Sequence, residues 1–162
     1  MKKILITLAL IMGIALSANA QFEQKKWYAG ASLTGLNLSY NGLEKLRLGA
    51  QAQGGYFIKD QIMLLGQASI ELSDNDAVAN HFKLGAGGRY YFQNNGVFLG
   101  ANVQFLHANH NHNDVMPGFE VGYAFFINGL VTIEPAIYYQ QSFQSHSDYS
   151  TVGLRIGFGI YK

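Results

Sequence analysis

The sequence predicts an all-β fold, an eight-stranded antiparallel up-and-down transmembrane β-barrel. Three observations support this prediction. Apolar and polar residues alternate with a period of two in eight runs from Trp27 onward, charged residues keep to one of the two faces that the alternation creates, and aromatic residues gather near the ends of the other face. The 19 glycines also argue against helices, because each costs about 1 kcal/mol in a helix relative to alanine.

The first 20 residues have the three-part layout of a secretory signal peptide. Two lysines precede an apolar run over residues 4–16, and Ala18-Asn19-Ala20 fits a cleavage site. We therefore expect cleavage before Gln21 and a barrel domain over residues 21–162. The apolar run is shorter than the roughly 20 residues that a spanning helix needs, which makes a retained anchor the weaker alternative.

Composition argues against several classes of function. The chain has no cysteine, which excludes a lipoprotein acylation site, disulfides, thiolate metal sites and a cysteine nucleophile. Without the two lysines of the signal peptide, nine basic residues face 10 acidic ones, so the net charge gives no electrostatic case for nucleic acid or for an anionic surface. We expect no nucleic-acid partner.

The strands are expected in chain order between clusters of Asn, Asp, Gly, Ser or His. They cover residues 27–39, 43–57, 61–72, 81–92, 97–107, 115–127, 131–143 and 149–161. In the first run the apolar residues change parity near Gly35, which a β-bulge would explain. The later runs alternate more regularly, and the last run is the clearest, with apolar residues at positions 152, 154, 156, 158 and 160.

Charge decides which face points outward. The polar face carries all the charged residues of the strand centres: Lys45, Arg47, Glu71, Lys83, Arg89, Glu120, Glu134 and Arg155. In a soluble barrel this polar face would be the exterior, but it is too rich in Gly, Ala and Ser for an ordinary solvated surface. The sequence therefore predicts that the apolar face contacts lipid and that the charges face the lumen.

Aromatic residues on the apolar face supply an independent indication. One group lies at one end of the strands and consists of Trp27, Tyr56, Tyr90, Phe92, Tyr123, Phe125 and Phe158, and a second lies towards the other end and consists of Tyr40, Phe82, Phe105, Phe119 and Tyr139. Ten residues separate Phe82 from Phe92, which at about 3.3 Å per residue and roughly 40° of tilt spans about 25 Å. This spacing matches the apolar band between two aromatic girdles.

The lumen of an eight-stranded barrel is just filled by side chains, so its charges are expected to form a packed structural network. When the hairpins are closed with the shortest loops that preserve face parity, Glu71 lies opposite Arg47 and Lys83, and Glu134 lies opposite Arg155. The expectation is a plugged lumen, with gating or selectivity of a narrow pore as the alternative.

Taken together, the chain resembles the small outer-membrane β-barrel family typified by OmpX and the membrane domain of OmpA. The family's C-terminal assembly signal is met by Thr151, Gly153, Ile156 and Phe158, although the chain departs from it in ending on Lys162 rather than an aromatic residue. The resemblance implies the outer membrane of a Gram-negative cell, a monomer, and contacts with outer-membrane lipid, lipopolysaccharide and the barrel assembly machinery. It also implies periplasmic turns at residues 58–60, 93–96 and 128–130, and outer segments at 40–42, 73–80, 108–114 and 144–148.

Two patterns in the outer segments suggest chemistry. All five histidines, His81, His107, His110, His112 and His146, fall in or beside those segments. His107, His110 and His112, near Asp114, could hold zinc or copper, but their spacing fits no standard motif, so we expect a solvated loop and no cofactor.

An enzyme that modifies lipid A is the other chemical alternative, and His146-Ser147-Asp148 is the nearest arrangement. Neighbouring residues on an extended segment point to opposite sides, so His146 is poorly placed to orient Ser147. The sequence thus favours a non-enzymatic outer-membrane protein with a structural or surface-interaction role. A narrow ion or small-solute pore is the first alternative.

Overall fold

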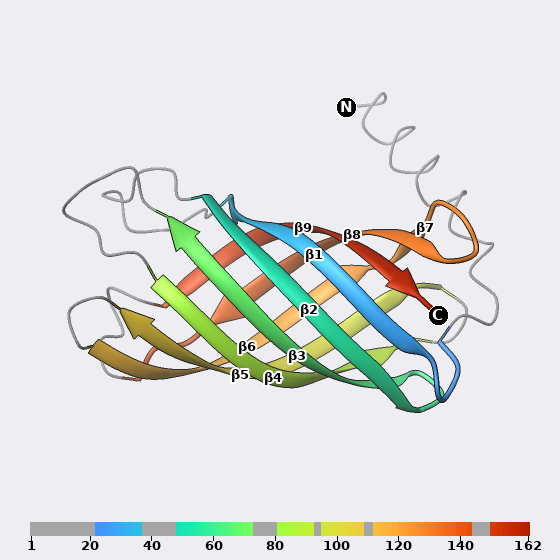
Figure 1. The fold of residues 1–162 in the computed structure, drawn as a ribbon, viewed down its shortest axis with the longest axis horizontal. Coiled ribbons are helices and arrows are strands. Elements are labelled where there is room, and N and C mark those ends of the chain that lie inside the picture. The colour runs from blue at the N-terminus through green and yellow to red at the C-terminus, as the bar shows by residue number, and fades with distance from the viewer. Residues whose placement is uncertain (1–21, 37–47, 73–80, 93–94, 109–111, 144–149) are drawn as a thin grey trace, which may run out of the picture.

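The computed structural model describes residues 22–36, 48–72, 81–92, 95–108, 112–143 and 150–162, which form one antiparallel sheet (Figure 1). Its strands are β1 (Trp27–Leu36), β2 (Leu48–Lys59), β3 (Ile62–Leu72), β4 (His81–Tyr91), β5 (Val97–Ala108), β6 (His112–Tyr123), β7 (Phe125–Phe126), β8 (Val131–Gln140) and β9 (Thr151–Tyr161). Among these residues no helix is long and apolar enough to cross a membrane. The signal peptide predicted for residues 1–20 lies outside the described residues.

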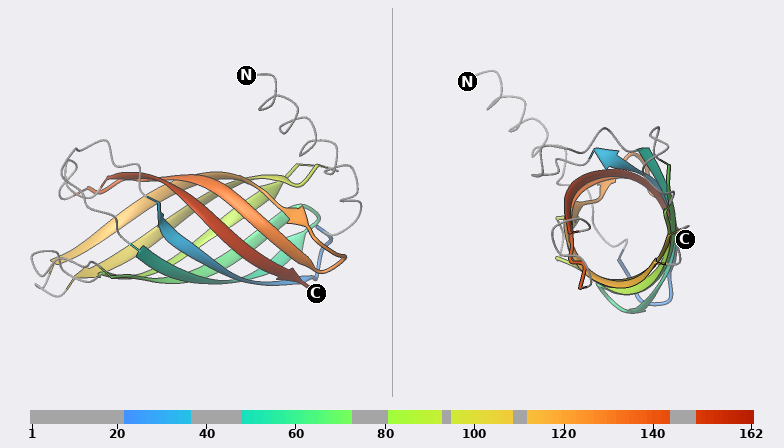
Figure 2. Two further views of the ribbon diagram at one scale, coloured as in Figure 1. Left: turned by 90° about the horizontal axis from the view of Figure 1, so that it is seen from above. Right: turned by 90° about the vertical axis from the view of Figure 1, so that its left-hand side faces the viewer.

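The sheet closes on itself. Each strand from β1 to β5 pairs with the next, β9 pairs with both β1 and β8, and β8 pairs with both β6 and β7. The view along the axis shows the resulting ring (Figure 2). Because β6 and β7 lie in line against β8, they form one wall of the barrel, and the predicted eight-stranded barrel is confirmed.

Two prolines border the β6–β8 ladder, which spans five residue pairs from Gly118↔Gln140 to Gly122↔Ala136. At one end, Pro117 accepts a hydrogen bond from Gln141 N (2.9 Å) but has no N–H to return one. At the other end, Pro135 comes directly before Ala136 in β8, at the position where the ladder would continue, and it likewise lacks an N–H donor. This explains why the wall is interrupted between β6 and β7.

The strand bounds differ from the prediction mainly around the fifth hairpin. Pairing of Leu106 with Asp114 and of Ala108 with His112 places residues 112–114 in β6, so the outer segment predicted at 108–114 is shorter than expected. The polar side chains of residues 112–114 do not show the alternation that predicts a strand. They pair with β5 through their backbone, which does not require apolar residues. The bulge predicted near Gly35 is confirmed, because the β1–β9 register shifts between Thr34 and Leu36. The other predicted outer segments lie outside the described residues.

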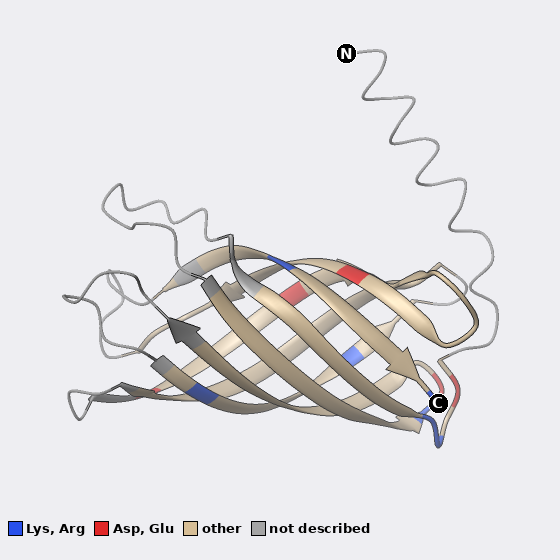
Figure 3. Cartoon of the chain, turned by 45° about the horizontal axis from the view of Figure 1, so that its top comes forward, with Lys and Arg blue, Asp and Glu red and all other residues tan. Residues whose placement is uncertain are grey.

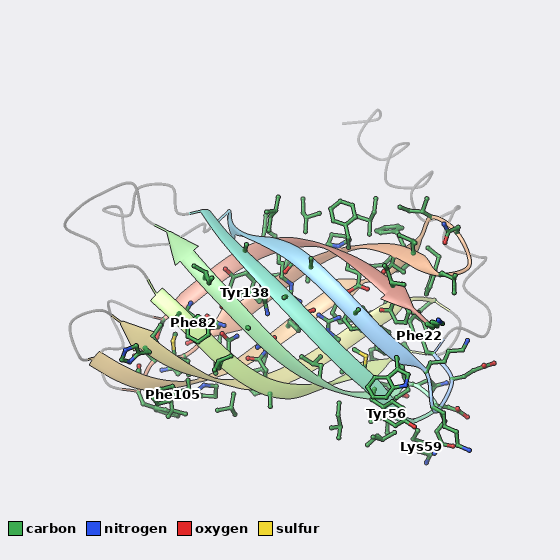
Figure 4. All side chains as sticks on the ribbon, in the orientation of Figure 1. Phe22, Tyr56, Lys59, Phe82, Phe105 and Tyr138 are labelled. Atoms are coloured by element: carbon green, nitrogen blue, oxygen red, sulfur yellow. The ribbon has the colours of Figure 1, made fainter. Side chains whose placement is uncertain are left out.

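The predicted polarity of the wall is also confirmed. Along β9, Leu154, Ile156 and Phe158 are 39%, 45% and 54% exposed, whereas Arg155 is 5% exposed. Apolar side chains project outward from the whole circumference (Figure 4). In water this surface would be unfavourable by about 25 cal/mol for each Å² of apolar area, whereas lipid removes that cost.

Candidate functional site: the filled lumen

An aromatic layer fills the end of the barrel where the two chain ends enter the sheet. Its members are Phe22, Phe57, Tyr91, Phe98, Phe126 and Tyr161. The Phe22 ring stacks on that of Tyr91 with 4.1 Å between centroids and lies edge-on to Tyr161 at 5.7 Å. Offset and edge-to-face contacts of this kind stabilise by about 1 kcal/mol each beyond burial. The layer closes this end of the lumen.

Phe22 reaches the lumen from a short segment before β1, residues 22–26, which we name the N-terminal strap. Three hydrogen bonds hold the strap to the β2–β3 turn: Gln61 N donates to Phe22 O (2.8 Å), Gln24 N to Asp60 Oδ1 (2.8 Å), and Lys25 N to Phe57 O (2.9 Å). Figure 4 shows Phe22 at this end of the barrel. The strap therefore covers this end of the barrel and places the Phe22 ring among the other aromatic side chains.

A buried cluster of charges follows in the middle of the lumen. Arg89 Nε lies 2.5 Å from Glu120 Oε1, and Arg89 Nη1 lies 3.0 Å from Glu134 Oε2. Arg155 Nη2 pairs with the second oxygen of Glu120. Two guanidinium groups thus face two carboxylates, and the four charges balance. Figure 3 shows blue and red segments on different strands of the barrel wall.

Neutral groups complete the cluster. Glu134 also accepts hydrogen bonds from Tyr28 OH (2.9 Å), Tyr161 OH (2.8 Å) and Thr132 Oγ1 (2.8 Å). Arg89 donates a further bond to Gln53 Oε1 (2.8 Å) and lies 4.5 Å from the centre of the Phe98 ring. Buried ions are tolerated only when their remaining donors and acceptors are used, and this arrangement meets that condition.

Beyond the charges, amide side chains fill the lumen towards the far end. Gln51 Nε2 donates to Gln67 Oε1 (2.8 Å), and Lys83 Nζ lies 3.4 Å from Gln140 Oε1. A cavity of about 20 Å³ lies among these side chains and is lined by residues that include Lys83 and Arg155. This is room for about one water molecule.

The far end of the described lumen is apolar again. Leu106 and Met116 point inward and are each 1% exposed, and beside them Ser142 Oγ donates to the buried carboxylate of Asp114. Along the described lumen, aromatic, ionic, amide and aliphatic side chains therefore follow one another in layers.

The residues predicted for the lumen network lie as follows. Lys83, Arg89, Glu120, Glu134 and Arg155 are all inward and buried, whereas Lys45, Arg47 and the side chain of Glu71 lie outside the described residues.

The predicted oppositions across strands are wrong by two residues. Arg155 pairs with Ala136 and Glu134 with Gly157; Glu71 pairs with Gly49 and His81 rather than with Arg47 and Lys83. The predicted inward face is correct, because a register shift of two residues leaves each side chain on the same face. The register itself is not set by the shortest possible loops.

Long side chains make their contacts over greater distances than strand pairing suggests. Arg89 and Glu120 lie on β4 and β6, and both pair with Gly100 of the intervening strand β5. A Cβ on Gly100 would come within 2.5 Å of Glu120 Cγ, so only glycine leaves the space in which the two ions meet.

The aromatic layer is the feature that sequence reasoning missed. Its signal is present in the sequence as Phe57, Tyr91 and Tyr161, which fall on the polar face near strand ends. Phe22 lay before the first predicted strand and gave no pattern at all.

Of the three histidines considered as metal ligands, the structure describes the side chain of His107 alone. His107 points outward and is exposed, whereas Asp114 is buried in the lumen, so these two side chains lie on opposite faces of the wall. Among the described residues no group of three or more His, Cys, Asp or Glu is placed to hold a metal. His110, the side chain of His112 and the segment His146-Ser147-Asp148 lie outside the described residues.

No protein-family model matches the chain, and no curated protein matches it. Solved structures do match. Neisserial surface protein A aligns with a TM-score of 0.60 and 11% identity, covering 83% of this chain and 96% of that one. The outer membrane protein Ail of Yersinia pestis, in a phospholipid bilayer nanodisc, aligns with a TM-score of 0.59 and 13% identity over 86% of this chain and 100% of Ail.

A de novo designed transmembrane β-barrel aligns with a TM-score of 0.55 and 11% identity, over 88% of this chain and 100% of the design. A designed barrel shares no ancestry with a natural chain, so likeness to it reflects architecture alone. The resemblance drawn from the sequence is thus confirmed in structure: the chain has the fold of the small outer-membrane β-barrels.

Proposed function

We propose that this protein is an integral outer-membrane barrel, exported with a cleaved signal peptide, whose role is structural or surface-interacting rather than enzymatic or transporting. Its wall supplies a lipid-facing surface and its filled lumen supplies rigidity. The ends of the strands and their connections then present a surface to whatever the protein contacts.

The packing of side chains inside the lumen is the observation that supports this proposal most directly. Arg89, Glu120, Glu134 and Arg155 hold one another in the middle, and the aromatic layer closes one end. Beside Lys83 and Arg155 the lumen contains a cavity of about 20 Å³, which has room for about one water molecule and is too small at that level for a hydrated ion or a solute.

Single-channel recording in planar bilayers tests the closed lumen. We expect the refolded protein to give no conductance steps, whereas the charge-balanced variant Arg89→Ser/Glu120→Ser, which empties the centre, should give small ones. Steps from the unsubstituted protein of the same size as those of the variant would overturn the closed lumen and favour the narrow pore.

The proposal that the protein is not an enzyme is tested separately. Mass spectrometry of lipid A from cells with and without the protein should give the same acyl pattern. A difference that depends on the protein would contradict the proposal and favour the lipid A-modifying alternative.

A further inference from the structure

Basic side chains gather at the end of the barrel that the aromatic layer closes. Lys25, Lys59 and Lys162 are exposed there, and we name these three residues the lysine collar. Within the described residues none of the three takes part in a salt bridge, whereas the neighbouring Lys26 pairs with Glu23 at 3.3 Å. Glu23 and Asp60 are exposed at the same end, so four lysines accompany two carboxylates, and the near-neutral net charge of the chain conceals a local excess of two positive charges.

The collar lies at the ends of three adjacent strands, β9, β1 and β2. Lys162 follows β9 and exchanges two backbone hydrogen bonds with Trp27 of β1 (2.6 and 2.9 Å), while Lys25 N donates to Phe57 O of β2, two residues before Lys59. Neighbouring strands are about 4.8 Å apart, so the three ammonium groups share one sector of the rim. Figure 3 shows blue segments gathered at this end together with red ones, and Figure 4 labels Lys59 beside Tyr56.

An aromatic pair lies on the lipid-facing side of the same sector. Trp27 is 66% exposed, and its ring centroid lies 4.8 Å from that of Tyr56. Tryptophan and tyrosine at the outer face of a barrel prefer the depth of the lipid headgroups. Lys25 lies two residues before Trp27, Lys59 lies three residues after Tyr56, and Lys162 lies opposite Trp27 across the β1–β9 ladder. The collar is therefore level with this pair or nearer the barrel end, which places its ammonium groups at the level of the headgroup phosphates.

The backbone of Lys25 adds a separate observation. Its φ is 73°, a left-handed conformation that costs a side chain other than Gly, Asn or Asp about 1 kcal/mol or more. A lysine at this position gives no packing in return, because its side chain is exposed. Its charge is therefore the property that a function of this position would use.

From these observations we infer that the lysine collar binds the phosphate groups of anionic phospholipids in the leaflet that contains the two chain ends. Each ammonium donates hydrogen bonds to phosphate oxygens while Trp27 and Tyr56 contact the adjoining glycerol and upper acyl chains. The barrel thereby recruits anionic lipid to one side of its circumference. This inference rests on the proposed insertion of the barrel into a membrane.

The chain offers its own probe, because Trp27 is its single tryptophan and lies beside the collar. We would reconstitute the barrel in vesicles of phosphatidylcholine and phosphatidylglycerol, with bromine on the acyl chains of one lipid and then of the other. Bromine quenches the fluorescence of a tryptophan that it contacts. Brominated phosphatidylglycerol should quench Trp27 more than brominated phosphatidylcholine, corresponding to a preference of about twofold or more at low salt.

The variant Lys25→Gln/Lys59→Gln/Lys162→Gln should lose this preference, and the charge-conserving variant with arginine at all three positions should keep it. Lys25→Asn should lower the preference while leaving the unfolding midpoint unchanged or raised, which separates lipid binding from folding. High salt should reduce the preference of the unsubstituted protein.

Equal quenching by both brominated lipids in the unsubstituted protein would contradict the binding of anionic lipid by the lysine collar but would be consistent with membrane insertion. Absence of quenching by either lipid would instead contradict the proposed insertion. An unchanged preference in the glutamine variant would also overturn the collar, since the ammonium groups would then play no part.

Discussion

Arg89 illustrates how one residue organises the lumen. It is 2% exposed, and all three guanidinium nitrogens have partners: Glu120 on Nε, Glu134 on Nη1 and Gln53 on Nη2. The inward direction of Arg89 follows from the period-two pattern, because alternate residues of a strand share a face. The partners of Arg89 cannot be predicted from this pattern. They depend on the register between strands and on how far the side chain extends across the lumen, and the local alternation of residues contains neither.

Replacing Arg89 by methionine should destabilise the barrel strongly. Arg89→Met retains most of the side-chain volume but leaves Glu120 to Arg155 alone and removes the ion pair of Glu134. Breaking a buried ion pair in this way costs about 3–5 kcal/mol. Urea unfolding of the refolded barrel in lipid vesicles measures the loss.

The exposed pair of Lys26 and Glu23 supplies the matched control. Glu23→Gln removes a salt bridge whose carboxylate side chain is 56% exposed, and such pairs contribute less than about 1 kcal/mol. If Arg89→Met cost no more than Glu23→Gln, the central cluster would not stabilise the lumen.

At the scale of elements, the N-terminal strap shows where sequence patterns stop being informative. The strands are visible because their faces alternate, whereas residues 22–26 have no period and take their conformation from hydrogen bonds to the β2–β3 turn. The same limit explains the first residues of β6. Their polar side chains suggested a loop, and only pairing with β5 reveals a strand.

Removal of the strap's aromatic plug should weaken the closed end of the barrel. Phe22→Ala deletes a ring that is 7% exposed and contacts Tyr91 and Tyr161, and truncation of a buried phenylalanine costs about 3 kcal/mol or more. Urea unfolding should show this loss, and Glu23→Ala in the same strap should show little. Equal effects of the two substitutions would mean that Phe22 is not seated in the lumen.

The β6–β8 ladder should be the part of the barrel wall that opens most readily. It has five residue pairs between Pro117 and Pro135, against eleven in the β2–β3 ladder. Amide hydrogen exchange followed by NMR in nanodiscs should therefore show faster exchange at Phe119 and Val121 than at Ala52 and Ala68, which pair across the β2–β3 ladder. Uniform protection along all the ladders would contradict this expectation.

For the whole molecule, the polarity of the two faces of the wall, rather than the number of strands, distinguishes a membrane barrel from a soluble one. Soluble barrels can also have eight strands, but this one exposes apolar side chains such as Leu33, Phe119 and Phe158 and buries Arg89, Glu120 and Glu134. That inversion could be predicted from the sequence because charge and alternation are local properties. The filling of the ends could not, because it depends on residues brought from separate strands and from the strap.

Nuclear Overhauser contacts between lipid acyl chains and side-chain methyl groups test this inversion most directly. In a methyl-labelled barrel in nanodiscs, the outward methyls of Val152, Leu154 and Ile156 should show contacts with lipid methylene protons. The inward methyls of Leu106 and Met116, each 1% exposed, should show none. Lipid contacts at Leu106 and Met116 without any at Val152, Leu154 and Ile156 would contradict a membrane barrel with a filled lumen.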